Sequence, residues 1–432
     1  MKITFIRPNM VHGRSSDAMP PLAFAALSAH TSQDVEKEFY DECIEEIPLD
    51  MDTDLVAISA HTFSARRAYE IADSYKGRGI PVVMGGYHPS FMPEEALGHA
   101  DSVVIGPAEG QWERLVSDAK AHRLSRIYDS REPAAMSSVH YDVGIFDGKK
   151  YTPVFPVEFT RGCRFECEFC SVSAFNKYTY TVRPLEAVVH DIRRSDAKRI
   201  LIVDDNVLSN RSEAKKLFEA LIPLKIQWGC QISIDVARDT DMLKLMARSG
   251  CVLCLIGFES LRKENLVQMR KGSHITGKEY AAAIGRIRDH GIMIYASFVF
   301  GYDFDTDDIF DQTLEFALKH KFVLANFNTL NPMPGTGLYD RLKSEGRLID
   351  ERWWLHERFK YGEVMFIPKH LTPEQLKQGC MRVRFEFSTV SAIVRRALDF
   401  KANCNSIGNL SLFLLANAVA RKEIRTKMKR LQ

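Results

Sequence analysis

The segment Arg161-Gly162-Cys163-Arg164-Phe165-Glu166-Cys167-Glu168-Phe169-Cys170 carries three cysteines within eight residues. It directly follows residues 156–160, a short apolar run with the composition of a strand. Three thiolates spaced x3 and then x2 can hold one face of an iron–sulfur cubane and leave one iron without a protein ligand. A structural zinc site is the alternative, and it would need a fourth ligand from elsewhere. The spacing and the position favour the open cluster.

Six strand-like runs, separated by helical patterns, begin at this point of the chain. This alternation of strands and helices is expected for a parallel sheet covered on both faces. The runs are residues 156–160, 199–203, 227–234, 253–258, 293–300 and 324–330. Together they predict a partial (β/α)6 barrel over residues 151–336. In barrels of this kind chemistry lies at the carboxyl ends of the strands, which is where the cysteine loop falls.

The residues before the barrel alternate in the same way. Their strand-like runs are residues 2–7, 35–40, 55–59, 81–85 and 102–105. This alternation predicts a doubly wound, Rossmann-like α/β domain over residues 1–135. Residues 136–150 are predicted to form a linker, and residues 337–432 a helix-rich extension. The fold class predicted for the whole chain is therefore α/β.

Composition excludes several classes of protein. The chain has 432 residues, of which 45% are hydrophobic and 26% charged, with a net charge of +2. It shows no broad basic face with interleaved aromatics, so we expect no nucleic-acid partner. No secretory signal and no apolar run long enough to span a bilayer are visible, so we expect a cytoplasmic location. An odd number of cysteines, nine, argues against a disulfide framework.

A second cysteine pair, Cys251 and Cys254, has C-x2-C spacing but enters a buried strand. Residues three apart on a regular strand point to opposite faces. We therefore predict that these two are buried structural thiols rather than metal ligands. The same interpretation serves for Cys43, Cys230, Cys380 and Cys404.

The C-x3-C-x2-C loop after the first strand of a βα barrel resembles that of the radical S-adenosylmethionine (SAM) superfamily. Members of this family reduce SAM at the open iron of a [4Fe–4S] cluster and release a 5′-deoxyadenosyl radical. The resemblance implies that Cys163, Cys167 and Cys170 hold the cluster. It places Phe169, before the third cysteine, where the backbone meets adenine. It also implies an external one-electron donor of the flavodoxin or ferredoxin type.

Two acidic strand ends resemble elements that contact SAM in this family. Asp204 and Asp205 follow the second strand and are expected at the SAM amino group, although either residue also suits a helix N-cap. Glu259 ends the fourth strand within a Gly-x-Glu-Ser element. A carboxylate at a barrel mouth is costly unless it is paired, which is consistent with a contact to SAM.

Two less specific positions complete the expected SAM site. Arg270, or Lys271 beside it, is expected to pair with the SAM carboxylate, with a solvated basic patch as the alternative. Gly301 follows the fifth strand and permits close backbone approach to a ligand, or simply makes a turn.

The amino-terminal domain has polar and glycine-rich motifs at successive strand–helix junctions, where an open parallel sheet binds its ligand. Neither a P-loop nor a G-x-G-x-x-G follows its first strand. The set resembles the cobalamin-binding domain of B12-dependent radical SAM enzymes. The expected cobalamin contacts are Pro21, Leu22, Ser59, Thr62, Gly85, Gly86, His88, Gly106 and Glu109.

One departure from many cobalamin proteins concerns the cobalt ligand. The D-x-H-x-x-G sequence that supplies a histidine is absent, so cobalt is expected to lack a protein histidine. His88 is a candidate contact to the cofactor elsewhere, and a capping or core histidine is the alternative.

The carboxyl-terminal segment combines an apolar run, residues 410–420, with a basic end. The basic residues are Arg421, Lys422, Arg425, Lys427, Lys429 and Arg430. A short apolar helix with a basic end can rest on an anionic membrane surface. The alternative is a helix packed on the barrel with a solvated tail.

The resemblance implies a cobalamin-dependent enzyme that methylates an unactivated carbon of a small-molecule or lipid-like substrate, with a [4Fe–4S] cluster, SAM and cobalamin as cofactors. Cyclisation, ring contraction or oxidation without methyl transfer is the alternative within the subgroup. A cobalamin or iron–sulfur sensor without turnover is the alternative from another class. The sequence identifies neither the substrate nor a catalytic acid or base.

Overall fold

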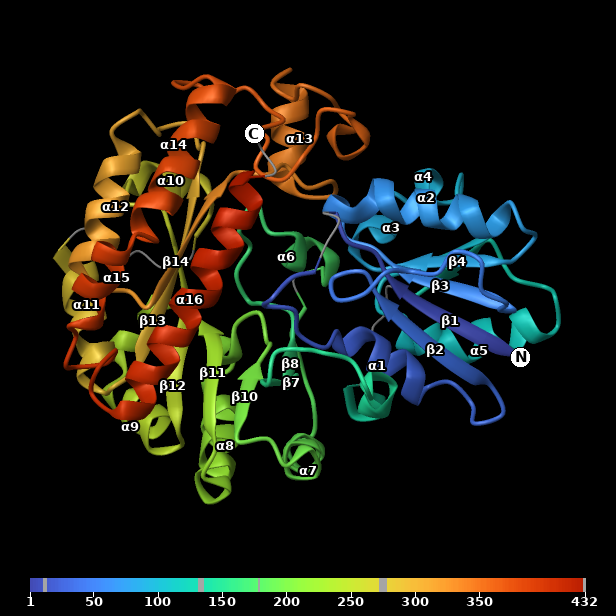
Figure 1. The fold of residues 1–432 in the computed structure, drawn as a ribbon, viewed down its shortest axis with the longest axis horizontal. Coiled ribbons are helices and arrows are strands. Elements are labelled where there is room, and N and C mark those ends of the chain that lie inside the picture. Colours follow the sequence, from blue (N-terminus) through green and yellow to red (C-terminus); the bar gives the residue numbers. More distant parts are fainter. Residues whose placement is uncertain (11–13, 131–135, 178, 272–277, 430–432) are drawn as a thin grey trace.

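The computed structural model describes residues 1–10, 14–130, 136–177, 179–271 and 278–429, and Figure 1 shows their arrangement. Of the residues singled out in the sequence, Arg430 lies outside the described part of the chain. Two parallel six-stranded sheets, each flanked by helices, lie side by side, and the carboxyl-terminal helices cover the second sheet (Figure 1). The predicted α/β class is confirmed.

The first sheet has the strand order β2-β1-β3-β4-β5-β6, and these strands pair in parallel. Its strands are β1 (Lys2–Arg7), β2 (Glu36–Asp41), β3 (Leu55–Ser59), β4 (Val82–Gly85), β5 (Ser102–Ile105) and β6 (Ile127–Asp129). The chain winds from β1 to one side and then to the other, so the order reverses between β1 and β3. Ligands of doubly wound sheets bind at the carboxyl ends of the strands beside such a reversal.

Helices cover both faces of this sheet, which is why its inner strands β3, β4 and β5 are mostly apolar. They are α1 (Leu22–Ala29), α2 (Ala65–Lys76), α3 (Tyr87–Phe91), α4 (Pro93–Ala96) and α5 (Glu109–Lys120). Phe24 of α1 and Trp112 of α5 pack on one face, and Tyr69 and Tyr75 of α2 pack on the other. The sheet is therefore buried except at its ends, and its carboxyl-terminal end faces the second sheet (Figure 1).

The second sheet follows the order β14-β13-β12-β11-β10-β7, so each strand pairs with its neighbour in the sequence. The strands are β7 (Phe155–Val157), β10 (Arg199–Ile202), β11 (Gln227–Ile232), β12 (Cys251–Glu259), β13 (Met293–Phe300) and β14 (Leu324–Thr329). In the described chain, β7 and β14 lie at opposite edges and do not pair. The sheet is thus an open version of a βα barrel, which confirms the predicted partial (β/α)6 core.

The second sheet's helices and a small ribbon complete this part of the fold. The helices are α6 (Ser171–Phe175), α7 (Leu185–Ser195), α8 (Arg211–Leu221), α9 (Thr240–Arg248), α10 (Lys263–Gln268), α11 (Lys278–Asp289) and α12 (Ile309–Lys319). Two antiparallel strands, β8 (Thr160–Arg161) and β9 (Thr181–Val182), bracket the cysteine loop. This ribbon fixes both ends of the loop.

The last part of the chain is helical, as predicted, and connects both sheets. It contains α13 (Gly337–Ser344), α14 (Pro373–Phe387), α15 (Val390–Ala397) and α16 (Ile407–Lys429). Before α14, the Trp354 indole donates a hydrogen bond of 2.8 Å to Glu95 of the first domain. Trp353 is fully buried beside it, in the core that contains α2. No helix within the described ranges is both long enough and apolar enough to cross a membrane.

Candidate active site between the two sheets

The cysteine loop runs from β8 to α6 in a conformation that requires glycine. Gly162 has φ +85°, and a Cβ there would lie 2.0 Å from the carbonyl oxygen of Thr179. Farther along, the Arg341 guanidinium of α13 donates a 2.7 Å hydrogen bond to the Glu168 carboxylate. The loop is therefore fixed at its start by backbone packing and near its end by an ion pair.

Cys163, Cys167 and Cys170 are all partly exposed on this loop. Among the described residues, these three sulfurs are not gathered closely enough to hold a single metal ion. Burial raises the pKa of Cys167 to about 12. Because thiolates are the ligands, binding of the cluster must displace the proton. Three partly open thiols on one loop are chemically suited to an open cubane.

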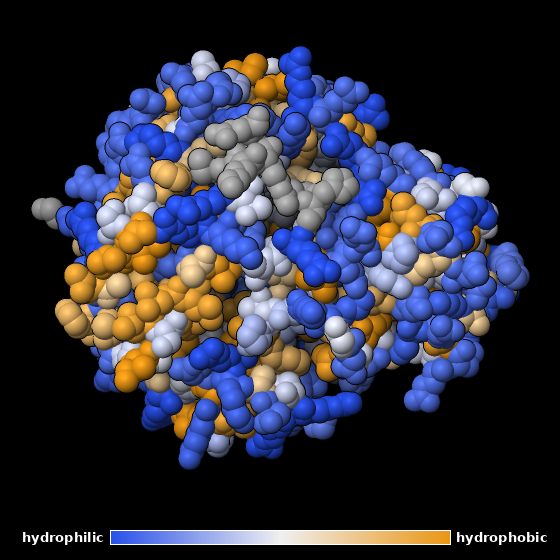
Figure 2. All heavy atoms as spheres, in the orientation of Figure 1, coloured by the Kyte–Doolittle hydropathy of each residue, from blue (hydrophilic) through white to orange (hydrophobic). Residues whose placement is uncertain are grey.

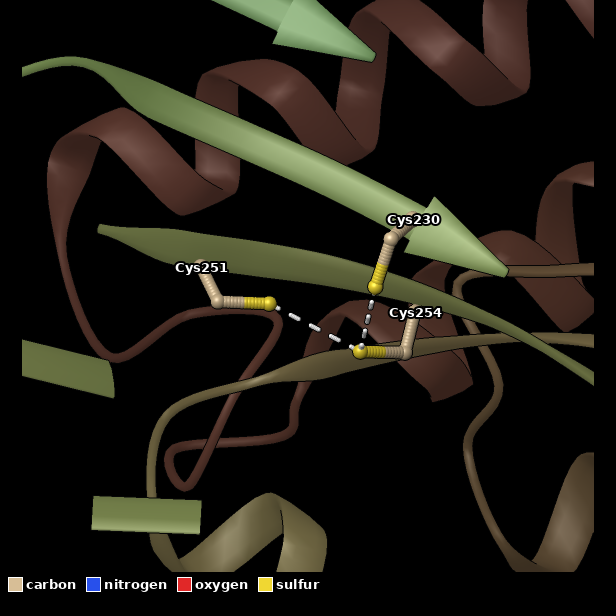
Figure 3. Close-up of side chains that lie close together, drawn as sticks. All are labelled: Cys230, Cys251 and Cys254. Carbon is tan, nitrogen blue, oxygen red and sulfur yellow. Dashed lines mark hydrogen bonds between the residues drawn. The ribbon is translucent and has the colours of Figure 1, made fainter. Parts of the chain in front are cut away.

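A different set of three sulfurs does converge, deep in the second sheet (Figure 3). The Cys254 sulfur lies 3.6 Å from that of Cys251 and 4.0 Å from that of Cys230. The predicted burial is correct, but the prediction of opposite faces is wrong. The register between β11 and β12 shifts at this point, and Val252 has no partner on β11. Cys251 therefore pairs with Trp228 and Cys254 with Cys230, and these two partners are two residues apart on β11. Both sulfurs therefore point to the same face.

This buried trio is poorly suited to hold a metal. All three side chains are buried, and within the described residues the group contains no fourth ligand. Three thiolates around a divalent ion would leave a net negative charge in an apolar core, which is costly without a cationic partner. We therefore retain the interpretation of packed thiols.

Asp204 has a structural position rather than one beside a ligand. It is 2% exposed, and its carboxylate accepts hydrogen bonds from the Phe159 backbone N–H at 2.8 Å and the Thr160 hydroxyl at 2.6 Å. Burial raises its pKa to about 7. The expectation that Asp204 contacts SAM is corrected: the side chain ties the end of β10 to the strand that leads into the cysteine loop.

Asp205 points the other way, toward the space between the two sheets. Its carboxylate accepts a 3.2 Å hydrogen bond from the Gly162 N–H at the start of the cysteine loop. Burial raises its pKa to about 6. Of the two aspartates, Asp205 is the one whose side chain can reach a ligand beside the cluster.

Glu259 ends β12 with φ +61°, a left-handed conformation that is rare for glutamate. Its carboxylate accepts a 2.6 Å hydrogen bond from Lys271, and both side chains are nearly buried. Burial lowers the pKa of Lys271, but the charges of Glu259 and the Cys167 thiol more than offset this and raise it. Lys271 therefore faces the cysteine loop, whereas Arg270 is exposed outside it. Of Arg270 and Lys271, the two cations considered as partners of the SAM carboxylate, Lys271 is the one beside the cysteine loop.

Phe169 and Gly301 differ in what surrounds them. Phe169 lines a large cavity beside the cysteine loop, as a ligand contact should. Gly301 has φ +113°, and a Cβ there would lie 2.7 Å from Leu376 and 2.9 Å from Phe366. Position 301 must be a glycine, because α14 and the segment before it leave no room for a Cβ. The expected contact of Gly301 with a ligand is therefore corrected to a packing role.

Most of the expected cobalamin contacts line one cavity of about 360 Å³ at the carboxyl ends of the first sheet. Its floor comes from the first domain and its roof from Glu158, Thr160 and Asp205 of the second. The residues that were expected and are found in this wall are Pro21, Leu22, Ser59, Gly85, Gly86, Gly106 and Glu109. Glu109 also binds the Arg161 guanidinium at 2.6 Å, which joins the two domains across the cavity.

Two expected contacts lie elsewhere. Thr62 lines the neighbouring large cavity. His88 is fully buried; its ring contacts the Thr62 hydroxyl at 3.3 Å, the Tyr69 hydroxyl at 3.0 Å and the Glu95 carboxylate at 3.1 Å. A fully buried ring cannot touch a ligand in the cavity, so His88 is the core histidine that the sequence left as the alternative.

His61 is the histidine that enters the site, and sequence reasoning did not select it. It lines both cavities, and much of its ring surface is open to them. Burial within the surrounding walls lowers its pKa to about 4, so the ring is neutral at physiological pH. His61 lies two residues after the end of β3 and directly before η1 (Thr62–Ser64), so it agrees with the strand-end rule that selected Ser59.

The larger cavity, of about 840 Å³, adjoins the first and shares Arg7, His61 and Tyr87 with it. Cys170 and Phe169 of the cysteine loop line it, together with residues of β14, α14 and α16 and of the first domain. Aromatic and aliphatic side chains dominate its wall; they are Met10, Phe63, Tyr87, Phe91, Phe169, Val172, Val299, Leu330, Met333, Phe359 and Tyr361. A bulky apolar molecule can therefore lie between the cysteine loop and the smaller cavity.

Arg384 of α14 is one of the charged residues of this wall, together with Arg7, Arg14 and Glu423. Its guanidinium donates to the Phe327 carbonyl oxygen at 2.6 Å and to the Asn328 side-chain oxygen at 3.3 Å. Among the described residues it pairs with no carboxylate. A half-buried arginine without a carboxylate partner can bind an anionic group of a ligand.

Comparison with known proteins agrees with this geometry. Residues 20–116 match the B12 binding domain, and residues 157–317 match the radical SAM superfamily. A bacteriochlorophyllide d C-12(1)-methyltransferase of Chlorobaculum tepidum is 30% identical over 389 residues, covering 87% of this chain and 84% of that protein. The chain belongs to the B12-binding radical SAM superfamily. It is a cobalamin-dependent radical SAM enzyme, and its cofactors are a [4Fe–4S] cluster, SAM and cobalamin.

Two further proteins are similar to this chain. An anaerobic magnesium-protoporphyrin IX monomethyl ester cyclase of Cereibacter sphaeroides is 25% identical over 433 residues, covering 88% of this chain and 69% of that protein. The solved structure of TsrM, a radical SAM methyltransferase from Kitasatospora setae with cobalamin and [4Fe-4S] cluster bound, has a TM-score of 0.64 at 16% identity. The match covers 88% of this chain and 81% of TsrM, and it shows a shared fold.

Proposed function

We propose that this radical SAM enzyme is a C-methyltransferase that acts on an unactivated carbon of a large, mostly apolar substrate carrying a carboxylate. The observation that carries the proposal is the larger cavity, which has the cysteine loop on one side and opens to the cobalamin-site residues through His61 and Tyr87. A molecule held there is adjacent to both cofactor sites. In support, the Chlorobaculum relative is named for methylating a bacteriochlorophyllide.

We further propose roles for the residues around the cofactors. Cys163, Cys167 and Cys170 hold the cluster, which supplies the electron for cleavage of SAM. Phe169, Asp205, Glu259 and Lys271 surround SAM. The residues of the smaller cavity hold cobalamin, which supplies the methyl group. The protein's own part is to hold substrate and cofactors in register and to exclude water from the apolar cavity.

The substrate class follows from Arg384 and from the apolar wall of the cavity. The guanidinium lines the same cavity as Phe169 and Cys170, so a carboxylate bound to it would fix one end of the substrate and leave an apolar end free to approach the cluster. A chlorophyll-type tetrapyrrole with a free propionate has this chemistry. Loss of a charge-assisted contact costs about 1.5–3 kcal/mol, so Arg384→Gln should weaken substrate binding by roughly one to two orders of magnitude.

The test uses chlorophyllide, with its free carboxylate, and its methyl ester as a matched ligand. Fluorescence quenching of the reconstituted enzyme should report tighter binding of the acid than of the ester, and Arg384→Gln should abolish the difference. Equal binding of acid and ester by the wild type would contradict the substrate class.

Cyclisation without methyl transfer is the second candidate, because the Cereibacter relative is named a cyclase. The two functions differ in the product. With SAM deuterated at its methyl group, methyl transfer adds three deuterons to the product, and cyclisation adds none.

A further inference from the structure

The outer surface of the carboxyl-terminal helices is unusually apolar. Of the fourteen large hydrophobic side chains that are exposed among the described residues, eight lie between residues 385 and 415. They are Phe385, Val390, Val394, Leu398, Phe400, Ile407, Leu414 and Leu415. Figure 2 shows hydrophobic side chains gathered over α15 and α16. Phe400 and Ile407, in and after the connection between the helices, are 75% and 87% exposed.

The spacing of these residues gives each helix an outward apolar face. Val390 and Val394 of α15 and Leu398, directly after it, are four residues apart, and Ile407 and Leu414 are two turns apart on α16. The two helices contact each other, so their outward faces adjoin. The eight residues therefore form one surface, which we call the apolar face, rather than scattered exposed side chains.

The inner sides of the same helices are firmly attached to the barrel. Arg396 is fully buried, and its guanidinium donates to the carbonyl oxygens of Phe322 and Val323 at 2.9 and 2.8 Å. Asn417 of α16 accepts a 3.0 Å hydrogen bond from Arg396 and donates one to Val323. The sequence left open that the carboxyl-terminal helix packs on the barrel, and the inner sides of α15 and α16 do pack there. This packing does not account for the outer side, which is held in place and left apolar.

The exposed charge beside the apolar face is mostly positive; at the α14 end, the partly exposed Glu386 pairs with Arg382. Between residues 387 and 429 the sequence contains two acidic residues, and both turn inward: Asp399 pairs with Arg288, and Glu423 bonds Ser16 and lines the larger cavity. The exposed basic residues beside the apolar face are Arg395, Lys401, Lys422 and Arg425. Within the described part of the chain, Arg395, Lys422 and Arg425 form no ion pair, whereas Lys401 pairs with Asp289.

We propose that α15, α16 and the connection between them dock on the surface of an anionic lipid bilayer. An apolar face about two helices wide can enter the boundary between headgroups and acyl chains, and the basic residues beside it can remain at the headgroups. The excess of positive charge favours anionic lipid over zwitterionic lipid. A second copy of this chain would bring the same positive charge against itself, so charge disfavours self-association.

Docking also bears on the proposed function. Helices α14 and α16 contribute Arg384, Glu423 and Thr426 to the wall of the larger cavity and Phe385, Leu414 and Leu415 to the apolar face. A docked enzyme would therefore hold that cavity close to the bilayer. This step rests on the proposed apolar substrate, whereas lipid binding itself does not.

The experiment is co-sedimentation of the full-length, cofactor-loaded enzyme with vesicles. One set contains equal parts of phosphatidylglycerol and phosphatidylcholine, and the other contains phosphatidylcholine alone. We expect binding to the first set, weakened by high salt, and at least about tenfold weaker binding to the second. Each basic residue near an anionic surface contributes about fivefold, so Lys422→Gln with Arg425→Gln should weaken binding about twentyfold or more.

A matched pair of double variants separates the apolar face from hydrophobic exposure in general. Phe400→Ser with Ile407→Ser removes two side chains of the face, and Ile349→Ser with Ile367→Ser removes two exposed ones outside it. The first should lower vesicle binding by about tenfold or more, and the second by less than about twofold, with melting curves confirming that both fold. Equal binding by both would overturn the proposal, as would no binding of the wild type to either vesicle set.

A different outcome is that the wild type forms a dimer and does not bind vesicles. If Phe400→Ser with Ile407→Ser then dissociated that dimer, the face would be assigned to a second copy. Loss of methyl transfer without loss of vesicle binding would count against the proposed function alone.

Discussion

Replacing Asp204 by asparagine should make the stability of the enzyme less dependent on pH. In the folded chain, burial raises the pKa of Asp204 from 3.8 to about 7. The folded state therefore binds this proton more tightly than the unfolded state. Stability consequently falls as pH rises from about 4 to about 7, and below pH 4 the effect is absent because both states are protonated.

The magnitude follows from the two pKa values. At 1.36 kcal/mol per pKa unit, a rise from 3.8 to about 7 corresponds to about 4 kcal/mol of unfavourable free energy above pH 7. An asparagine carries no charge at any of these pH values, and its oxygen can still accept the hydrogen bond from the Phe159 N–H. Asp204→Asn should thus match the wild type near pH 4 and exceed it by a few kcal/mol at pH 8.

Urea unfolding of the cofactor-free protein at pH 4.5, 6 and 8 measures this difference. Asp241→Asn is the control, because Asp241 is exposed on the surface of α9 and should show no such trend. A stability difference between Asp204→Asn and wild type that stays constant across pH would refute the reasoning. So would a large loss of SAM affinity in Asp204→Asn with the cluster intact, since the buried carboxylate has no contact with the cavities.

Three further predictions concern the cofactor sites. Cys167→Ala should lose the cluster and SAM cleavage, because three ligands leave none to spare. Cys251→Ala, the control, should keep the iron content of the wild type. The reverse result in an anaerobic iron assay would contradict the ligand assignment. Glu259→Gln should weaken SAM binding by roughly one to two orders of magnitude in calorimetry; if it and Lys271→Met only lower the melting temperature, the ion pair is purely structural. Co(II) cobalamin in the enzyme should give an electron paramagnetic resonance spectrum without nitrogen splitting; a splitting that His61→Ala abolishes would instead make His61 the cobalt ligand.

The fold could be predicted from the sequence because its strands are continuous apolar runs bounded by turns. Leu55–Ser59, Ser102–Ile105 and Met293–Phe300 coincide with the predicted bounds. The predicted cobalamin residues were identified by one rule, that ligands lie at the carboxyl ends of parallel strands, and seven of the nine share a cavity. β6 was missed because Ile127–Asp129 has only three residues, too few to show a period.

The errors have specific physical causes. The shared face of Cys251 and Cys254 depends on a bulge, and an alternating pattern cannot reveal one extra residue. Asp204 and Asp205 are adjacent in sequence and point to opposite sides of a strand end, so only the backbone shows which one is buried. Arg384 and Trp354 come from far along the chain, and their contacts with the cavity and the first domain depend on tertiary packing.

The central claim is that the loop of Cys163, Cys167 and Cys170 forms one radical SAM and cobalamin site together with the two adjoining cavities. The most direct measurement uses enzyme purified anaerobically with cobalamin, reduced and incubated with SAM deuterated at its methyl group. Mass spectrometry should find 5′-deoxyadenosine and corrinoid carrying a deuterated methyl group with the wild type, and no 5′-deoxyadenosine with Cys167→Ala. Cluster-loaded wild type that binds cobalamin but forms neither product would contradict the account.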